Sequence, residues 1–315
     1  MSLTETPVVT ETVIDNAAWS RAKPRLSVLI PFYRDDPRAL LDALDQQSAD
    51  GTVEAVVLDD GGVQAAVSTA VEGHLRKLSV PVRLVRLSSN EGRARGRNRL
   101  AAHARADTLL FLDADMLPDR PDFLDRWLAE VRAGSPVAVG GFTVDRAPEA
   151  AGTALHRRMS QRSDCVPADQ RALAPEKHVF TSNLLIRRDV FESEAFDESF
   201  AGWGWEDVEW GMRVARRWPI RHIDNTATHL GLDAAPALIG KYEQSAANFA
   251  RVVAAHREVV STYPSYRAAQ ALKRAPLPGV WRPALKRAAL AEWAPLDMRA
   301  LAARLYRAAL YAEVL

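Results

Sequence analysis

Cysteine is almost absent from this chain, which has only Cys165 among its 315 residues. A single cysteine excludes an intrachain disulfide framework and any zinc site built from several thiolates, and it suits a reducing compartment. No pair of basic residues is evident that would activate Cys165, so we do not expect a thiol nucleophile.

A charge excess of one sign and long apolar runs are also missing. The 41 basic and 40 acidic side chains leave a net charge of +1, so no global field attracts a polyanion and nucleic-acid binding is not expected. No run approaches the roughly twenty apolar residues of a membrane span. The acidic, threonine-rich start, residues 1–16, lacks the basic and apolar regions of a signal peptide. We therefore expect a cytoplasmic protein.

What the sequence does contain is an alternation of strand and helix signals. β-rich runs alternate with segments of helical spacing, which predicts an α/β fold with a mostly parallel sheet and right-handed crossovers. The expected strands are 25–31, 53–58, 82–87, 108–112, 136–144 and 179–186, and the expected helices are 36–47, 61–78 and 91–105. Residues 145–177 have weak periodicity and are interpreted as loops and a helix that could shape acceptor binding.

The domain boundaries follow from these patterns. Residues 1–23 have no clear period and are expected to form a loose N-terminal extension. The α/β domain should cover 24–235, and an alanine-rich helical region interrupted by prolines should cover 236–315.

Polar side chains follow several of the expected strands, where parallel sheets bind their ligands. Asp113 and Asp115 leave a buried run on the same side of the pleat, which suits oxygen ligation of a hard divalent cation. Asp59 or Asp60 can accept a hydrogen bond from a pyrimidine N–H, although the sequence Asp-Asp-Gly-Gly at 59–62 is also an ordinary turn signal.

A second acidic cluster lies about ninety residues further on. Glu206 and Asp207 open an expected helix, and simple helix capping is the alternative to a catalytic role. Tryptophans at 203, 205 and 210 alternate with small residues, and so much aromatic surface predicts a cleft wall that could hold a sugar.

Other candidate ligands lie between and beyond these clusters. Pro31 and Tyr33 can pack against a base or ribose, and Arg97 with Asn98 is the pair that we expect to face a donor phosphate, since guanidinium suits phosphate. His229 can serve as a metal ligand, because imidazole suits manganese as well as zinc; a structural histidine is the alternative.

Five motifs in this order resemble family 2 glycosyltransferases of GT-A fold. They are PFYRDD, LDDGG, NEGRARGRN, LDADM and GWGWEDVEWGMR, within residues 25–232. The last motif is similar to the galactosyltransferase type of C-terminal half that bacterial chondroitin polymerases also contain. The chain departs from the usual Ala-Arg-Asn triplet, which is Gly96-Arg97-Asn98 here, and LDDGG lacks the common serine after the first glycine.

The resemblance implies a Rossmann-like GT-A domain and an inverting transferase that uses a UDP-sugar and Mn²⁺ or Mg²⁺. It implies roles for residues of each motif: Asp60 on uracil, Asp113 and Asp115 as the DxD pair on ribose and metal, His229 as a further metal ligand, Asp207 as catalytic base, and Glu206 on substrate hydroxyls. The acceptor would be a saccharide or lipid-linked saccharide of bacterial-type polysaccharide or glycoconjugate synthesis. The choice among UDP-galactose, UDP-GlcNAc and UDP-GalNAc stays open.

Two other functions fit part of this pattern. A sugar nucleotidyltransferase shares the fold class and the acidic residues, but it would need a glycine-rich loop where Pro31-Phe32-Tyr33-Arg34 stands. An inactive carbohydrate-binding or scaffold protein would have no reason to keep Asp113, Asp115, Asp207 and His229 together.

The C-terminal 236–315 segment combines basic residues with Trp, Tyr and Leu. Such helices can lie on an anionic membrane, which would make the protein peripheral on the inner face of the cytoplasmic membrane. Packing on the catalytic domain, or a homodimer contact, is the alternative.

Overall fold

The computed structural model describes residues 9–48, 51–62, 65–276 and 278–315. Its α/β part holds eleven strands in the described residues. They are β1 (Glu11–Asp15), β2 (Leu26–Phe32), β3 (Val53–Asp59), β4 (Val82–Leu87), β5 (Thr108–Leu112), β6 (Met116–Pro118), β7 (Val137–Val139), β8 (Phe142–Thr143), β9 (Asn183–Arg187), β10 (Ile220–His222) and β11 (Ala227–His229).

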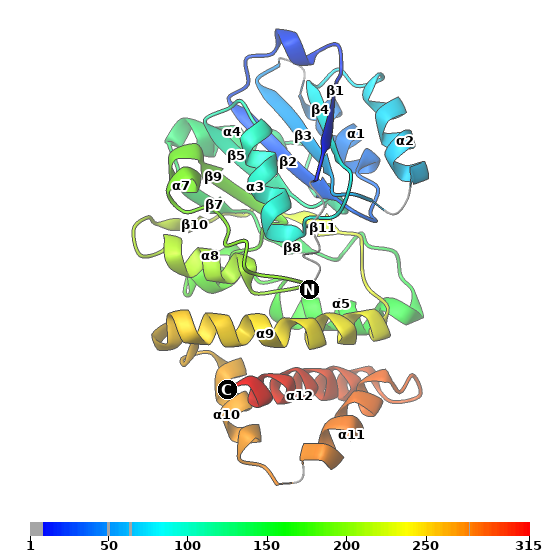
Figure 1. The fold of residues 1–315 in the computed structure, drawn as a ribbon, viewed down its shortest axis with the longest axis vertical. Coiled ribbons are helices and arrows are strands. Elements are labelled where there is room, and N and C mark those ends of the chain that lie inside the picture. The colour runs from blue at the N-terminus through cyan, green and yellow to red at the C-terminus, as the bar shows by residue number, and fades with distance from the viewer. Residues whose placement is uncertain (1–8, 49–50, 63–64, 277) are drawn as a thin grey trace, which may run out of the picture.

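Helices flank the sheet and make up the C-terminal region (Figure 1). The α-helices are α1 (Arg38–Gln47), α2 (Ala65–Leu75), α3 (Arg93–His103), α4 (Phe123–Ala133), α5 (Ala154–Ser163), α6 (Ala168–Arg171), α7 (Arg188–Ser193), α8 (Glu206–Val214), α9 (Ala235–Val260), α10 (Pro264–Lys273), α11 (Pro278–Leu290) and α12 (Leu296–Val314). Short 3₁₀ turns lie at Trp19–Arg21, Ala151–Thr153 and Pro175–His178.

The main sheet has the strand order β1-β4-β3-β2-β5-β9-β7-β10. Strands β4, β3, β2 and β5 run parallel, and β9 is antiparallel to both neighbours. The central strands are buried on both faces, as apolar runs in a parallel sheet require. A second sheet, β6-β11-β8, lies beyond the carboxyl end of β5. The expected alternation of strands and helices is confirmed.

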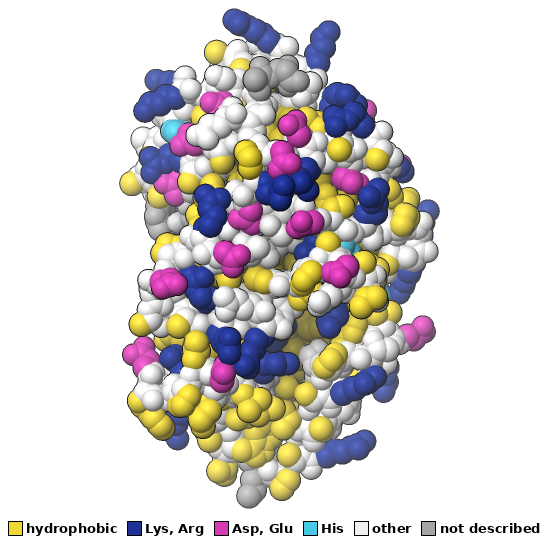
Figure 2. All heavy atoms as spheres, turned by 180° about the vertical axis from the view of Figure 1, so that it is seen from behind, with side chains coloured by type: hydrophobic (Ala, Val, Ile, Leu, Met, Phe, Trp, Pro, Cys, Tyr) yellow, Lys and Arg dark blue, Asp and Glu magenta, His cyan; other side chains and the backbone are white. Residues whose placement is uncertain are grey.

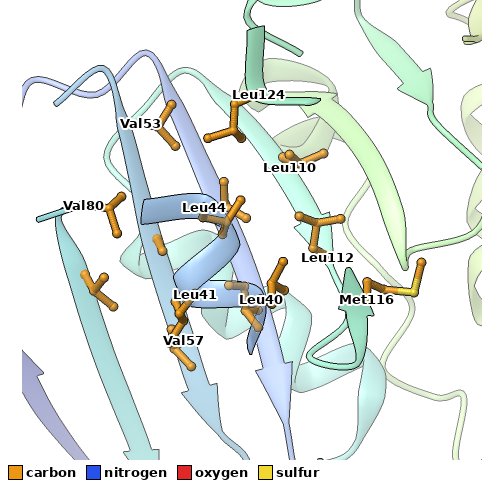
Figure 3. Packing of buried hydrophobic residues seen from close by; sticks show 14 of the residues in the cluster. Leu40, Leu41, Leu44, Val53, Val57, Val80, Leu110, Leu112, Met116 and Leu124 are labelled. Carbon is orange, nitrogen blue, oxygen red and sulfur yellow. The ribbon is translucent and has the colours of Figure 1, made fainter. Parts of the chain in front are cut away.

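The core forms because α1 presents one apolar face to the sheet. Leu44 lies four residues after Leu40 and three after Leu41, and all three are buried against side chains of the central strands, among them Val57 (Figure 3). Burying each leucine contributes roughly 1.5–3 kcal/mol. The other face of the sheet packs against α3 and α8 through a second cluster that contains Phe111 and Trp210.

Two expectations about the strands are corrected. Residues 11–15 are not part of a loose extension, because β1 pairs with β4 as an edge strand and Trp19 is buried after it. The strand expected over 136–144 is two strands in different sheets, because the chain turns at Gly140 and at Gly141, whose φ is +75°.

The C-terminal region packs against the α/β part. Helix α9 begins at Ala235 and crosses below the sheets, and α12 lies beneath it (Figure 1). Leu155 and Met159 of α5 share a cluster with apolar residues of α9 and α12. None of the helices in the described ranges is long and apolar enough to span a membrane.

Candidate active site

The carboxyl ends of β2, β3 and β5 bring the predicted site residues to one edge of the sheet. Phe32 pairs with Asp59 in the β2–β3 register, so Tyr33 and Asp60 leave the sheet side by side. β5 lies on the other side of β2 and ends at Leu112. Asp113 follows it directly and so reaches the same edge of the sheet. Pro31 and Tyr33 are half-buried here, with the Arg34 guanidinium 5.4 Å from the Tyr33 ring centre.

Asp60 is buried and fixes the loop between β4 and α3. Its Oδ1 accepts from the backbone N–H of Glu91 at 2.8 Å, and its Oδ2 accepts from Asn90 Nδ2 at 2.8 Å and from the Gly92 N–H at 3.1 Å. Burial nevertheless raises the pKa of Asp60. These hydrogen bonds hold the Asp60 carboxylate in place at the strand edge, where it could contact a nucleobase.

Asp59 has a different role from Asp60. Its carboxylate accepts from the Gly62 N–H at 2.9 Å and from the Ser68 hydroxyl, and Arg86 Nε lies 3.4 Å away. With 1% of its surface exposed, Asp59 stabilises the turn and α2. The expectation that Asp59 faces a donor is therefore corrected, because its side chain points into the fold toward Ser68 of α2.

Asp113 is held by arginine. Arg97 Nη2 donates to its Oδ1 at 2.7 Å, and Arg93 Nη2 lies 3.9 Å from Oδ2. The Arg97 side chain is 2% exposed and lies on α3, which packs against β2 and β3. This pairing explains how a buried guanidinium is compensated, and it places positive charge beside the strand edge.

Asn98 does not point at this group. Its Nδ2 donates to the Phe196 carbonyl at 3.0 Å and its Oδ1 accepts from the Phe196 N–H at 3.1 Å. The expectation that Asn98 faces a donor phosphate is therefore corrected, because its side chain has a structural role. The side chain fixes the loop that leads to Trp203 and Trp205, and sequence spacing alone carries no sign of that long-range pairing.

Asp115 and His229 form the second half of the expected metal site. Pairing of His229 with Met116 across β11 and β6 brings the ring against Asp115, with His229 Nε2 3.0 Å from Asp115 Oδ2. Burial lowers the pKa of His229, but the hydrogen bond and charge of Asp115 outweigh burial and raise it. A Cβ at Gly231 would lie 2.0 Å from Asp115 Oδ2, so a larger residue there would displace this carboxylate.

The donor types at this edge fit a divalent cation, although the ligands are not gathered around one point. Within the described part of the chain, no three His, Cys, Asp or Glu side chains converge closely enough to hold an ion. Asp115 and His229 supply an oxygen and a nitrogen that face each other, whereas Asp113 is turned to Arg97. Carboxylate and imidazole ligands together suit manganese.

Sequence reasoning missed two neighbours of this site. Desolvation and then the charges of Asp115 and Asp113 raise the pKa of Asp35, so three carboxylates share one field. His156 of α5 lies edge-on to His229, with ring centres 5.7 Å apart, and its Nδ1 accepts from the Asp233 N–H at 2.7 Å. The sequence signal was available for Asp35, which directly follows the Tyr33-Arg34 pair.

The first turn of α8 carries the other acidic pair. Trp205 has φ +76°, the only positive value for a non-glycine residue in the described ranges, and it turns the chain sharply into α8. Glu206 is 4% exposed and accepts from Arg93 Nε at 2.5 Å. The same α3 arginine therefore links Glu206 and Asp113, which joins the two acidic clusters.

Asp207 differs from Glu206 in its protonation. Burial, followed by the charge of Glu206, raises the pKa of Asp207 to about 7. For Glu206, burial alone would raise the pKa, but Arg93 and Arg97 outweigh it and lower the pKa. Opposite pKa shifts on adjacent carboxylates are typical of acid–base sites, and they favour a catalytic role for this pair over simple helix capping.

The tryptophans do not form an exposed cleft wall. Trp210 is fully buried and donates to the Glu194 carbonyl, and Trp205 is 9% exposed with its Nε1 2.9 Å from the Tyr311 hydroxyl. Trp203 alone of the three is half-buried, against Tyr242. The expectation for Trp205 and Trp210 is corrected, because α9 and α12 cover Trp205 and Trp210 packs beside Phe196 under the main sheet.

A model of the family described as glycosyl transferase family 2 matches residues 27–194, from β2 through α7. The chain belongs to glycosyl transferase family 2. The match includes the aspartates at the ends of β3 and β5, and α8 lies beyond it.

Relatives of this family member resemble only parts of it. The chain is 36% identical over 95 residues to the uncharacterized glycosyltransferase YfnE of Bacillus subtilis. The matched segment covers 30% of this chain and 24% of the relative. It is 27% identical over 221 residues to human polypeptide N-acetylgalactosaminyltransferase 13, covering 61% of this chain and 38% of that protein. The matched part thus spans less than half of these relatives.

Solved structures of similar fold cover nearly the whole chain. Mannosyltransferase PcManGT from Pyrobaculum calidifontis, in complex with GDP-Man and Mn²⁺, has a TM-score of 0.59 at 18% identity and covers 94% of this chain and 89% of its own. S. aureus TarS 1-349 in complex with UDP-GlcNAc has a TM-score of 0.52 at 16% identity and covers 92% of this chain and 90% of its own. The GT-A fold of the family 2 transferase, including the C-terminal helices, is therefore shared.

Proposed function

We propose that this family 2 glycosyltransferase is an inverting, metal-dependent enzyme. It transfers a hexose or N-acetylhexosamine from a UDP-sugar to a saccharide or lipid-linked acceptor in polysaccharide or glycoconjugate synthesis. The observation that carries the proposal is the Asp207 carboxyl, whose pKa is raised to about 7 beside the Glu206–Arg93 pair.

The donor is assigned to the edge formed by β2, β3 and β5. Hydrogen bonds hold the Asp60 carboxylate in place, and Pro31 with Tyr33 forms a half-buried surface next to it. Together these residues suit a uracil and its ribose. Two solved structures of similar fold are complexes with nucleotide sugars, TarS with UDP-GlcNAc and the mannosyltransferase with GDP-Man. Both observations support a nucleoside diphosphate sugar as the donor class.

Charge for the leaving diphosphate is available from two sources. Arg97 and Arg93 provide guanidinium groups beside Asp113. Asp113, Asp115 and His229 would hold Mn²⁺ or Mg²⁺, which supplies Lewis-acid stabilisation of the departing UDP. Holding a cation there would require Asp113 to release part of its contact with Arg97.

Asp207 is the proposed base of a single displacement. The acceptor hydroxyl oxygen bonds to the anomeric carbon as the bond from that carbon to the UDP oxygen breaks, and the hydroxyl proton passes to Asp207. Attack opposite the leaving group inverts the configuration. Glu206, kept ionised by Arg93, accepts from substrate hydroxyls.

The experiment is donor hydrolysis by the purified protein. Incubation with UDP-glucose, UDP-galactose, UDP-GlcNAc and UDP-GalNAc, with Mn²⁺ or with excess chelator, should release UDP from one or two donors and only with metal. Asp115→Ala should lose that metal response, whereas Asp45→Ala, in a carboxylate on α1 away from this edge, should keep it. Full hydrolysis in chelator, or no release from any donor, would refute the proposal.

A further inference from the structure

Arg307 of α12 lies among three aromatic rings, one of which, Trp205, directly precedes α8. Its guanidinium carbon is 5.2 Å from the Tyr242 ring centre, 5.4 Å from that of Tyr311 and 6.0 Å from that of Trp205. Its Nε donates to the Tyr311 hydroxyl at 2.7 Å. One edge of the guanidinium is therefore fixed, and the plane of the group is confined by rings.

Within the described part of the chain, the other edge of this guanidinium has no hydrogen-bond or ion-pair partner. In the residues that the structure describes, Arg307 forms no ion pair, and its only hydrogen bond is the one from Nε. Asp164 contributes to its electrostatic field but lies beyond ion-pair distance. Side chains this enclosed are usually paired, and a half-buried arginine with free terminal N–H groups is suited to a ligand.

The position of Arg307 relates it to the proposed base. The Trp205 ring that contacts Arg307 belongs to the residue just before Glu206 and Asp207. On the other side, the charges of both Arg307 and His229 act on Asp164, at the end of α5. Arg307 is thus next to the turn that opens α8, and its charge acts on Asp164 as that of His229 does.

We propose that Arg307 recognises an anionic group, a carboxylate or a phosphate, on the acceptor saccharide that presents its hydroxyl to Asp207. The inference rests on the proposed transferase function and names its acceptor class. A guanidinium binds such oxyanions with two parallel hydrogen bonds. The half-buried Trp203, whose ring centre is 6.2 Å from that of the buried Tyr242, offers an apolar face against which a sugar ring packs.

Three glycosides that differ only at carbon 6 test this inference. p-Nitrophenyl β-glucoside, the corresponding glucuronide and the glucoside 6-phosphate would be titrated into the full chain in the presence of UDP and Mn²⁺. The wild type should bind both anionic probes roughly 10- to 100-fold more tightly than the neutral one, the ratio expected for charged hydrogen bonds. Preference for only one of the two anions would identify the acceptor group as carboxylate or phosphate.

Arg307→Gln should abolish this preference and leave UDP binding unchanged. Arg304→Gln is the matched control, because Arg304 lies one turn earlier on α12 and is exposed. Arg307→Lys keeps a charge above the rings but lacks the two-pronged geometry, so its preference should be intermediate; it replaces Arg307→Gln if that variant unfolds.

Equal binding of the three probes by the wild type, or binding of none, would overturn the inference. An unchanged preference in Arg307→Gln, or in Arg307→Lys where that variant replaces it, would overturn it as well. The result is separable from failure of the transferase proposal, which would appear as absent UDP-sugar hydrolysis in the wild type. The anion preference is an equilibrium property and is measured without turnover.

Discussion

At the scale of single residues, Arg93 is the contact that organises the site. It donates to Glu206 at 2.5 Å and lies 3.9 Å from Asp113, so one side chain of α3 serves clusters more than ninety positions apart in the chain. The charge of Arg93 helps to lower the pKa of Glu206, which therefore stays ionised. The negative charge of Glu206 in turn helps to raise the pKa of Asp207. The difference between the two adjacent carboxylates therefore originates in α3.

The first prediction is a pH dependence with opposite signs for activity and stability. A base with a pKa of about 7 must lose its proton to act, so kcat/KM should rise with pH through about 7. Since the folded-state pKa of Asp207 is raised above that of an unfolded aspartate, its contribution to the free energy of unfolding is present at low pH and is lost as pH rises through about 7. Urea unfolding between pH 4 and 8 measures this loss. A stability profile identical to that of Asp207→Asn would contradict it.

Residue types in motifs could be assigned from the sequence, but their partners could not. Asp60, Asp113, Asp115 and Asp207 all lie at the ends of elements where the motifs predict them. Asp59 is adjacent to Asp60 yet faces α2, because successive residues of a strand point to opposite sides. Which of the two faces the ligand depends on what covers each face of the sheet, and a single sequence does not contain that.

At the scale of elements, the turn after β3 is fixed by the loop after β4. Gly61 has φ +64°, and a Cβ there would lie 2.2 Å from the Ser89 carbonyl carbon. The close approach lets Asp60 reach the N–H groups of Glu91 and Gly92. Glycine is needed at this position for both its backbone angle and its lack of a side chain.

We expect Gly61→Ala to reduce the free energy of unfolding by about 2–5 kcal/mol, from backbone strain and the overlap with Ser89 together. Gly134→Ala is the control: Gly134 has φ +70° after α4 but nothing within 4 Å of its added Cβ, so only about 1 kcal/mol should be lost. Urea unfolding of both variants measures the difference. Equal losses would show that the contact with the β4–α3 loop contributes nothing.

Element boundaries were predictable where apolar patterns were strong. Strands β2, β3 and β5 are continuous buried runs, and their positions agree with the sequence to within a residue or two. β1 was missed because it is an exposed edge strand, whose register with β4 depends on backbone pairing and not on burial. The break between β7 and β8 was missed because the Gly140-Gly141 turn is set by Asn183 and Arg171, which lie far away in sequence.

At the scale of the whole molecule, the C-terminal helices have two unlike faces. One face packs on the α/β part, where the rings of Tyr311 and Trp205 have centres 5.9 Å apart. The other carries most of the exposed large apolar side chains of the described residues: Val280, Trp293, Met298 and Leu301. Figure 2 shows hydrophobic side chains gathered at this end, with basic ones around them.

This second face favours membrane binding. Packing of the first face on the α/β part is compatible with it. We expect the protein to sediment with anionic vesicles at low salt, and the double change Trp293→Ser with Leu301→Ser to reduce that binding. Leu173→Ser is the control, because Leu173 is 85% exposed but lies beside α6. Failure of the wild type to bind, or equal binding by all three proteins, would leave packing as the sole role of these helices. Point changes are preferable to truncation, which would remove the buried Tyr311.

The central claim is that Asp207 deprotonates the acceptor, and transfer by Asp207→Asn tests it most directly. Asparagine keeps the shape and the hydrogen bond with the Val208 N–H, which lies 2.8 Å from Oδ1, but it cannot take a proton. We expect the variant to fold and to bind the UDP-sugar as the wild type does, while turnover with acceptor falls by at least ~100-fold, the lower end for loss of a general base. Near wild-type turnover in Asp207→Asn would contradict the account and place the base elsewhere.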